Sequence, residues 1–301
     1  MRAIVTGGAG FIGSHVVEAL LDRGDEVHVL DDLSKGKREN VPDGAELHVA
    51  DIREPDAVFD AVRPEAVLHL AAQADVRVSV ERPALDADVN VVGTVRILEA
   101  ARRHDAQVVF ASTGGAIYGE CDGPAPEAAP RRPLAPYGAS KLCGEEYLAM
   151  YNRLYGASHV ALRFGNVFGP RQEPHGEAGV VAIFMGLLHD GGVPKIFGDG
   201  RQTRDYVFVG DVARAVLAAL GRDGAVFNVG TGLETSVLEL YAAIQDAAGT
   251  EREPAFEPPR IGELQRSVLD VSLAERELDW RAEYSLAQGL AATWSWVTSV
   301  T

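Results

Sequence analysis

The sequence predicts an α/β protein built on a doubly wound parallel sheet, with a second, smaller α/β unit toward the C-terminus. Short, almost continuously apolar runs alternate with helical patterns from residue 2 to residue 164. A glycine-rich string, TGGAGFIG at residues 6–13, directly follows the first of these runs. After residue 164 the composition changes to a stretch rich in Gly, Pro, His and Asn, which indicates that the chain crosses into the second unit.

The expected strands are rich in Val, Ile, Leu and Phe, as is typical of a parallel sheet covered on both faces. They span residues 2–6, 26–30, 46–50, 66–70, 107–112 and 159–164. The segments between them carry apolar residues at three- and four-residue spacing, which predicts helices. These helices span residues 11–23, 55–62, 84–104 and 137–155.

The second half continues with shorter elements. We expect helices at 180–189, 212–220 and 237–248, strands at 195–197, 205–208 and 225–229, a proline-rich turn at 254–259, and two helical segments ending near Trp296. The predicted division places residues 1–164 plus about 204–229 in the larger domain. The smaller domain then takes about 165–203 plus 230–301.

Composition narrows the class of protein. The formal net charge of −16 argues against nucleic acid as the main partner, because binding a phosphate backbone needs a basic surface. No apolar run approaches the roughly 20 residues of a membrane span, and no secretion signal is recognisable, so we expect a cytoplasmic protein without membrane contact. The two cysteines, Cys121 and Cys143, have no His/Cys cluster nearby, so no metal site is predicted.

The glycines Gly7, Gly10 and Gly13 lie between a predicted strand and a predicted helix. Glycines in this position let backbone N–H groups approach a pyrophosphate at a helix N-terminus. The second apolar run ends in Asp31 and Asp32, which can accept hydrogen bonds from the ribose of NAD and would repel a 2′-phosphate. The sequence therefore predicts an NAD site.

Tyr137 and Lys141 are four residues apart on a predicted helix and so share one face. A phenol with a pKa near 10 is a poor base at neutral pH. A neighbouring ammonium and the positive nicotinamide both favour the phenolate. The pair therefore predicts a tyrosine base beside the cofactor.

Several strings together carry a family resemblance. They are the glycine string, NVVGT at 90–94, FAST at 110–113, Pro136-Tyr137-x-x-x-Lys141, the pattern from Arg163 to Arg171, RQTRDYV at 201–207 and Pro259-Arg260-x-Gly262-Glu263. With these, the chain resembles the extended short-chain dehydrogenase/reductase family and, within it, the UDP-glucose 4-epimerases. The resemblance covers nearly the whole chain. It implies the Rossmann type of sheet, with NAD on the larger domain and a sugar nucleotide on the smaller one.

The resemblance also implies roles for individual residues. The catalytic ones are Tyr137, Lys141 and Thr113. The NAD site would be lined by Gly7, Gly10, Phe11, Ile12, Gly13, Asp31, Asp32, Lys35, Gly36, Asp51, Ile52, Leu70, Ala71, Ala72, Gln73, Asn90 and Phe164, together with the catalytic three. The substrate site would be lined by Thr113, Tyr137, Asn166, Val180, Phe197, Arg204, Arg260, Glu263 and Ser267. No metal is implied.

The activity implied is inversion of C4 of a UDP-hexose through a transient 4-keto sugar. Tyr137 would take the proton of the C4 hydroxyl, Thr113 would orient that oxygen, and Lys141 would lower the pKa of the phenol. UDP-glucose and UDP-galactose are the expected pair. Ser267 stands where a bulky aromatic would restrict the pocket, which favours acceptance of N-acetylhexosamines as well. The family also predicts a symmetric homodimer through the helices at 84–104 and 137–155.

One departure from the family pattern concerns the catalytic threonine. Three residues, Gly114, Gly115 and Ala116, precede Ile117-Tyr118-Gly119, where the epimerases usually have two, so the position of Thr113 over the sugar stays open. Sugar-nucleotide dehydratases carry Asp-Glu directly after the threonine, and glycines cannot transfer protons. The dehydratase reaction is therefore disfavoured.

Two alternatives remain. The first is a UDP-glucuronate decarboxylase or 4-epimerase of the same family, which would need a cation or polar cluster for the C6 carboxylate. The second is an NAD-binding sensor without turnover, against which the Tyr137/Lys141 pair argues.

Overall fold

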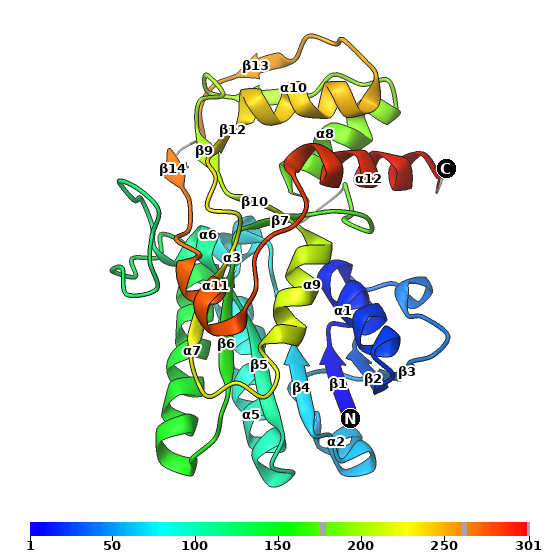
Figure 1. Ribbon diagram of the computed structural model, residues 1–301, viewed down its shortest axis with the longest axis vertical. Helices are drawn as coiled ribbons and strands as arrows, with labels where there is room; N and C mark the ends of the chain where they lie inside the picture. Colours follow the sequence, from blue (N-terminus) through cyan, green and yellow to red (C-terminus); the bar gives the residue numbers. More distant parts are fainter. Residues whose placement is uncertain (175–178, 261–263, 300–301) are drawn as a thin grey trace.

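The computed structural model describes residues 1–174, 179–260 and 264–299. Its larger part is a seven-stranded sheet with the order β11-β6-β5-β4-β1-β2-β3, in which every neighbouring pair is parallel (Figure 1). The strands are β1 (Arg2–Thr6), β2 (Glu26–Asp31), β3 (Glu46–Val49), β4 (Ala66–His69), β5 (Gln107–Thr113), β6 (Val160–Phe164) and β11 (Val226–Val229). The predicted doubly wound sheet is confirmed.

Helices cover both faces of this sheet, as the apolar runs predicted. On one face α1 (Phe11–Asp22), α9 (Val209–Ala218) and α11 (Ser272–Leu278) share a core with the odd-numbered positions of β1 and β2. On the other face lie α2 (Asp56–Val62), α5 (Gly93–Arg103) and α7 (Pro136–Tyr155). Because all strands are parallel, their carboxyl ends meet at one edge, which points toward the smaller part of the molecule (Figure 1).

The predicted single helix at 84–104 is wrong at its start. The structure has α3 (Val76–Glu81), α4 (Pro83–Ala87), a π-helical turn η2 (Asp88–Val92) and then α5. Asp75 caps α3 by accepting hydrogen bonds from the backbone N–H groups of Arg77 and Val78, and Pro83 opens α4 at its first position. These two local signals explain why the helical region begins earlier and in pieces.

The smaller part contains α8 (Val180–His189), α10 (Val237–Ala248) and α12 (Leu286–Ser299), which bury a core of their own. Short strands accompany them: β8 (Lys195–Phe197) pairs with β13 (Ala255–Glu257), and β9 (Thr203–Arg204) lies between β12 (Thr235–Ser236) and β14 (Arg266–Ser267). The predicted turn at 254–259 therefore contains a strand. An outer strand of a two-stranded pair tolerates flanking prolines, since only one of its edges is bonded.

The chain passes between the two parts several times. β7 (Asn166–Phe168) and β10 (Tyr206–Phe208) run in parallel at the crossing, where the buried Asp205 carboxylate joins the crossing segments. Its oxygens accept from the Thr231 N–H and hydroxyl at 2.7 Å, from the Gly232 N–H at 3.0 Å and from the Leu269 N–H at 3.4 Å. The smaller part is thus tied to the carboxyl edge of the large sheet.

One segment differs from the predicted domain division. Residues Ala274, Leu278 and Trp280, expected in the smaller domain, are buried in the core beneath β11 and α9. The Trp280 indole N–H donates to the Asp211 carbonyl of α9 at 3.0 Å. The segment around α11 therefore returns to the large sheet.

Candidate active site

The glycine string forms a tight turn between β1 and α1. Gly7 has a φ of +71°, and a Cβ there would lie 2.7 Å from the Ala71 nitrogen. At Gly13 a Cβ would lie 2.1 Å from the Gly7 carbonyl oxygen. Only glycine leaves room for this turn, and its backbone N–H groups form a cradle of the kind that holds a pyrophosphate. Phe11 and Ile12 follow at the start of α1 and pack against the core of the smaller part.

Asp31 holds the far side of this turn. Its carboxylate accepts from the Ala9 N–H at 3.0 Å and from the Leu33 N–H at 2.9 Å, and burial raises its pKa. Gly36 packs on it so closely that a Cβ would lie 2.7 Å from Oδ1. Asp32 and Lys35 are exposed beside it. Asp31 therefore shapes the loop around the predicted ribose site, whereas Asp32 presents its carboxylate to solvent.

Asp51 and Ile52 follow β3. Asp51 accepts from the backbone N–H of Arg53 at 2.8 Å and from its guanidinium at 2.9 Å, and this arginine lowers the pKa of the carboxyl group. Ile52 lies against Gly93, where a Cβ would be 2.7 Å from the Ile52 Cδ1. The start of α5 is thus packed directly on the loop predicted to border the adenine.

The loop after β4 is held by one buried amide. Asn90 accepts from the Gln73 N–H and donates to the Gln73 carbonyl, both at 2.8 Å, and it also donates to the Ser140 hydroxyl at 3.2 Å. The loop contains half-buried Leu70, Ala71 and Ala72. Asn90 therefore joins this loop to α7. The residue predicted to line the NAD site also holds the loop after β4 in place.

Lys141 is anchored beneath the sheet edge. It is 3% exposed, and its ammonium donates to the Ala111 carbonyl at 2.9 Å and lies 4.8 Å from the centre of the Phe110 ring. Burial lowers its pKa to about 8, and the Asp86 charge opposes that shift. Tyr137 lies one turn earlier on α7 and is half-buried. A titratable ammonium and a phenol therefore share a helix that packs on β5.

Thr113 ends β5 opposite Phe164 in β6. The three residues that follow, 114–116, belong to a helical turn, α6 (Gly114–Ile117), rather than to an open loop. A Cβ on Gly114 would lie 2.6 Å from the Leu269 side chain, and a Cβ on Gly138 would lie 2.6 Å from the Ala116 oxygen. The extra residue is thus absorbed in a packed turn on which the first turn of α7 rests.

The predicted substrate residues lie on the smaller part and at its junction with the large sheet. Asn166 opens β7 and its amide oxygen faces Gly115, while Val180 opens α8. Arg204 and Ser267 face each other across β9 and β14. The Arg260 guanidinium lies over the Phe197 ring at 3.8 Å, although Arg260 is otherwise exposed. Glu263 falls outside the described residues.

A buried polar network lies behind the Tyr137–Lys141 helix. Glu145, one turn beyond Lys141, accepts from the Ser112 hydroxyl at 2.5 Å and forms an ion pair with Arg163 at 2.6 Å. Arg163 in turn donates to the Tyr118 hydroxyl at 2.7 Å, which donates to Asn228 at 2.7 Å. The sequence interpretation gave Ser112, Glu145, Tyr118 and Asn228 no role. The sequence feature that indicates such a network is Arg163, a charged residue inside the otherwise apolar strand Val160–Phe164.

Comparison with known proteins decides the family. The sequence model of the NAD dependent epimerase/dehydratase family matches residues 3–230. The chain belongs to this family. Its relatives include a UDP-glucose 4-epimerase of Mycolicibacterium smegmatis, 50% identical over 306 residues, with 97% of each chain covered.

Two solved structures are similar over the full length. UDP-glucose 4-epimerase from Thermotoga maritima with UDP-glucose is 44% identical, with a TM-score of 0.98, and the match covers 100% of this chain and 99% of that one. UDP-glucose 4-epimerase from Thermus thermophilus in complex with NAD is 47% identical, with a TM-score of 0.94 and 100% of both chains covered. The predicted family and fold are confirmed.

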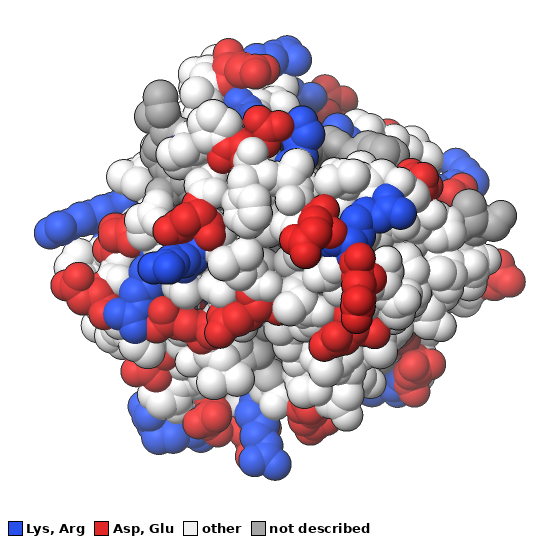
Figure 2. Space-filling model, turned by 90° about the horizontal axis from the view of Figure 1, so that it is seen from above, with Lys and Arg blue, Asp and Glu red and all other residues white. Residues whose placement is uncertain are grey.

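Charged side chains of both signs lie on the surface (Figure 2). On the face that Figure 2 shows, basic side chains are interspersed with acidic ones instead of forming a continuous basic area. None of the helices in the described part of the chain combines the length and apolarity that a membrane crossing requires.

Proposed function

We propose that this chain is an NAD-dependent epimerase that inverts C4 of a UDP-hexose, with UDP-glucose and UDP-galactose as its substrate pair. The observation that carries the proposal is the placement of Tyr137 and the buried Lys141 on a helix packed against the carboxyl end of β5, at the same edge of the sheet as the Gly7 turn. The 44–50% identity to UDP-glucose 4-epimerases over nearly the full chain supports the substrate class.

The residues around the Gly7 turn fit a dinucleotide. A Cβ on Gly7 or Gly13 would collide with the backbone of Ala71 or Gly7, so the turn closes only with glycines, and Asp31 accepts from the Ala9 N–H within it. When bound, NAD supplies a hydride acceptor that takes hydrogen from C4 of the sugar and returns it. The protein must then hold the sugar so that either face of C4 can be presented.

Tyr137 acts as the base for the C4 hydroxyl, and Thr113 orients the sugar oxygen. The Lys141 ammonium favours the phenolate form of Tyr137, because a nearby positive charge stabilises the charged state of an acid. The Ala111 carbonyl fixes this ammonium, so the charge is in place before substrate arrives. Glycines 114 and 115 next to Thr113 have no proton to transfer, in keeping with epimerisation rather than elimination of water.

The diphosphate is held by the smaller domain. Arg204 and Arg260 are suited to this, because a planar guanidinium can grip phosphate oxygens with two N–H groups. Stacking on Phe197 orients the Arg260 plane and leaves its edge available. Asn166 and Val180 border the same region, and Ser267 lies beside Arg204 where the sugar would be admitted. With the diphosphate fixed, the 4-keto sugar turns about its phosphate linkage.

We also propose the domain roles. NAD binds to residues 1–164 with about 204–229, to which the α11 segment is added by its packing, and the sugar nucleotide binds to the remainder. We infer a symmetric homodimer through α7, as the resemblance implies, with the neighbouring α3 in place of the helix expected at 84–104; Val76 and Val80 of α3 and Tyr147 and Leu154 of α7 are exposed. Four exposed apolar side chains on two contacting helices favour burial against a second copy.

The test is turnover by the purified protein and two tyrosine variants. We expect conversion of UDP-galactose to UDP-glucose, and a loss of about 10²-fold or more in kcat for Tyr137→Phe, the scale of general acid–base catalysis. Tyr147→Phe removes the hydroxyl of an exposed tyrosine on the same helix and should keep wild-type turnover. Near-wild-type kcat in Tyr137→Phe would remove the proposed base. An inactive wild type that still binds NAD would favour a sensor.

A further inference from the structure

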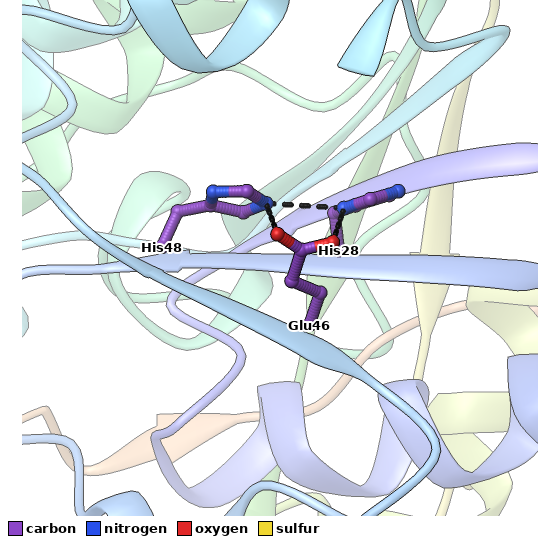
Figure 3. A group of neighbouring side chains, drawn as sticks. All are labelled: His28, Glu46 and His48. Carbon is purple, nitrogen blue, oxygen red and sulfur yellow. Dashed lines mark hydrogen bonds and ion pairs between the residues drawn. The ribbon is translucent and has the colours of Figure 1, made fainter. Parts of the chain in front are cut away.

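Three side chains with metal-binding atoms meet on one face of the large sheet, on the two strands that lead to Asp31 and Asp51. In the parallel register of β2 and β3, His28 lies opposite Glu46 and Leu30 lies opposite His48. Side chains two residues apart on a strand share a face, so the two imidazoles and the carboxylate converge (Figure 3). β3 is the edge strand of the sheet, at the opposite side of β1 from β5.

The distances between the ligand atoms suit a tetrahedral ion. The His28 Nδ1 lies 3.0 Å from the His48 Nε2 and 3.5 Å from a Glu46 oxygen, and the His48 Nε2 lies 3.8 Å from the other Glu46 oxygen. With zinc–ligand bonds of about 2.0–2.2 Å, two ligands of a tetrahedral zinc are separated by about 3.3–3.5 Å. The two imidazole nitrogens and a Glu46 oxygen all lie within 4.8 Å of one another, a spacing close to that of three ligands around one ion.

The surroundings add two features of a metal site. The second ring nitrogen of His28 lies 3.2 Å from a Glu26 oxygen, so a carboxylate can fix the tautomer that presents Nδ1 to an ion. Glu46 is 67% exposed, so a fourth position is open to water.

We propose that His28, Glu46 and His48 bind a divalent transition-metal ion, with Zn²⁺ as the ion best suited to two imidazoles and one carboxylate. The bound ion links the edge strand β3 to β2 and so fixes the loop with Asp51 and Ile52 that follows β3. Residue spacing did not predict this site, because its ligands come from two strands joined only by sheet pairing.

Calorimetric titration of EDTA-treated protein with ZnCl₂ tests the proposal, together with Co²⁺ absorption as a report on geometry. We expect one equivalent of Zn²⁺ and the visible bands of tetrahedral Co²⁺. His48→Ala should weaken Zn²⁺ binding by about tenfold or more, and Glu46→Gln should weaken it in the same direction. His104→Ala is the matched control, because His104 also lies beside a carboxylate, that of Asp60 at 3.2 Å, but belongs to no cluster of three metal-binding side chains within residues 1–174, 179–260 and 264–299.

Two results of the zinc titration would overturn the proposed metal site. A Kd weaker than about 1 mM in the wild type overturns the site, as does undiminished affinity in Glu46→Gln. Circular dichroism of each variant separates loss of a ligand from loss of the fold, and Glu46→Gln, at an exposed position, is the variant that keeps the fold. The Tyr137→Phe enzyme should bind Zn²⁺ like the wild type, so this result is independent of turnover.

Discussion

At the scale of single residues, the ammonium of Lys141 sets a pH limit on the proposed reaction. Its folded pKa of about 8 is lower than the ordinary value because it is buried. Below pH 8 it is charged and favours the Tyr137 phenolate, whereas above pH 8 that support is lost. We expect kcat/KM to fall above about pH 8 and this limb to be absent in the weakened Lys141→Met enzyme, measured from about pH 6 to about pH 10.

The pH dependence of the free energy of unfolding gives an independent test of the lowered pKa of Lys141. Between about pH 8 and the ordinary lysine pKa, the unfolded chain holds the Lys141 proton while the folded chain releases it. Stability of the wild type relative to Lys141→Met should therefore rise with pH across that window. A difference in stability that does not change with pH would mean that Lys141 titrates at its ordinary value.

Ser267 provides the residue-scale prediction on specificity. It is buried beside Arg204 and is small, so we expect the wild type to turn over UDP-N-acetylglucosamine as well as UDP-glucose. Ser267→Tyr should lower kcat/KM for the N-acetyl sugar by at least about tenfold more than for UDP-glucose, since a bulky ring occupies the space of the 2-substituent. Equal effects on both sugars would show that Ser267 does not select the substituent.

At the scale of elements, α7 depends on contact with α6. A Cβ on Gly138 would lie 2.6 Å from the Ala116 oxygen and 2.9 Å from the Pro133 Cβ, so one of these must move. We expect Gly138→Ala to cost about 1–3 kcal/mol of stability and to lower kcat by displacing Tyr137. Gly123→Ala, where a Cβ meets nothing within 4 Å, should leave both the thermal midpoint and kcat unchanged. A wild-type thermal midpoint in Gly138→Ala would contradict the packing argument.

The elements that the sequence predicted best are those with strong local patterns. The strands of the large sheet are continuous apolar runs, and the structure confirms them within a residue or two at either end. Helix α3 and the division of the predicted helix at 84–104 were missed, because these boundaries depend on the cap at Asp75 and on Pro83 rather than on apolar periodicity. The strand β13 was missed because pairing with β8 overrides its prolines.

Among the site residues too, those with a short-range sequence pattern were predicted and those that depend on contacts between distant segments were not. Gly7, Asp31, Tyr137 and Lys141 stand out because their spacing along the chain is short and their chemistry is specific. The network of Ser112, Glu145, Arg163, Tyr118 and Asn228 could not be assembled from the sequence, since its members come from five separate segments. The same holds for the cluster of His28, Glu46 and His48.

At the scale of the whole molecule, the exposed apolar face of α3 and α7 predicts association. Light scattering at micromolar concentration should give twice the 32.1 kDa mass of the chain. Leu154→Glu would place a charge on a side chain that is 63% exposed in the single chain, and it should shift the mass toward that of the monomer without loss of helix content. A monomeric wild type under these conditions would remove the proposed dimer.

The crossing at Asp205 has a consequence for how this chain reaches its fold. The smaller part is not continuous in sequence, and the segments that lead into and out of it are brought together at residues 166, 205, 231 and 269. Each of these contacts closes a long loop of the chain. Closing a loop costs conformational entropy, which is offset only once the enclosed segments pack. We therefore expect the large sheet to form first and the smaller part to condense onto it, so refolding should show a slow step that reports on Trp294 and Trp296 of α12.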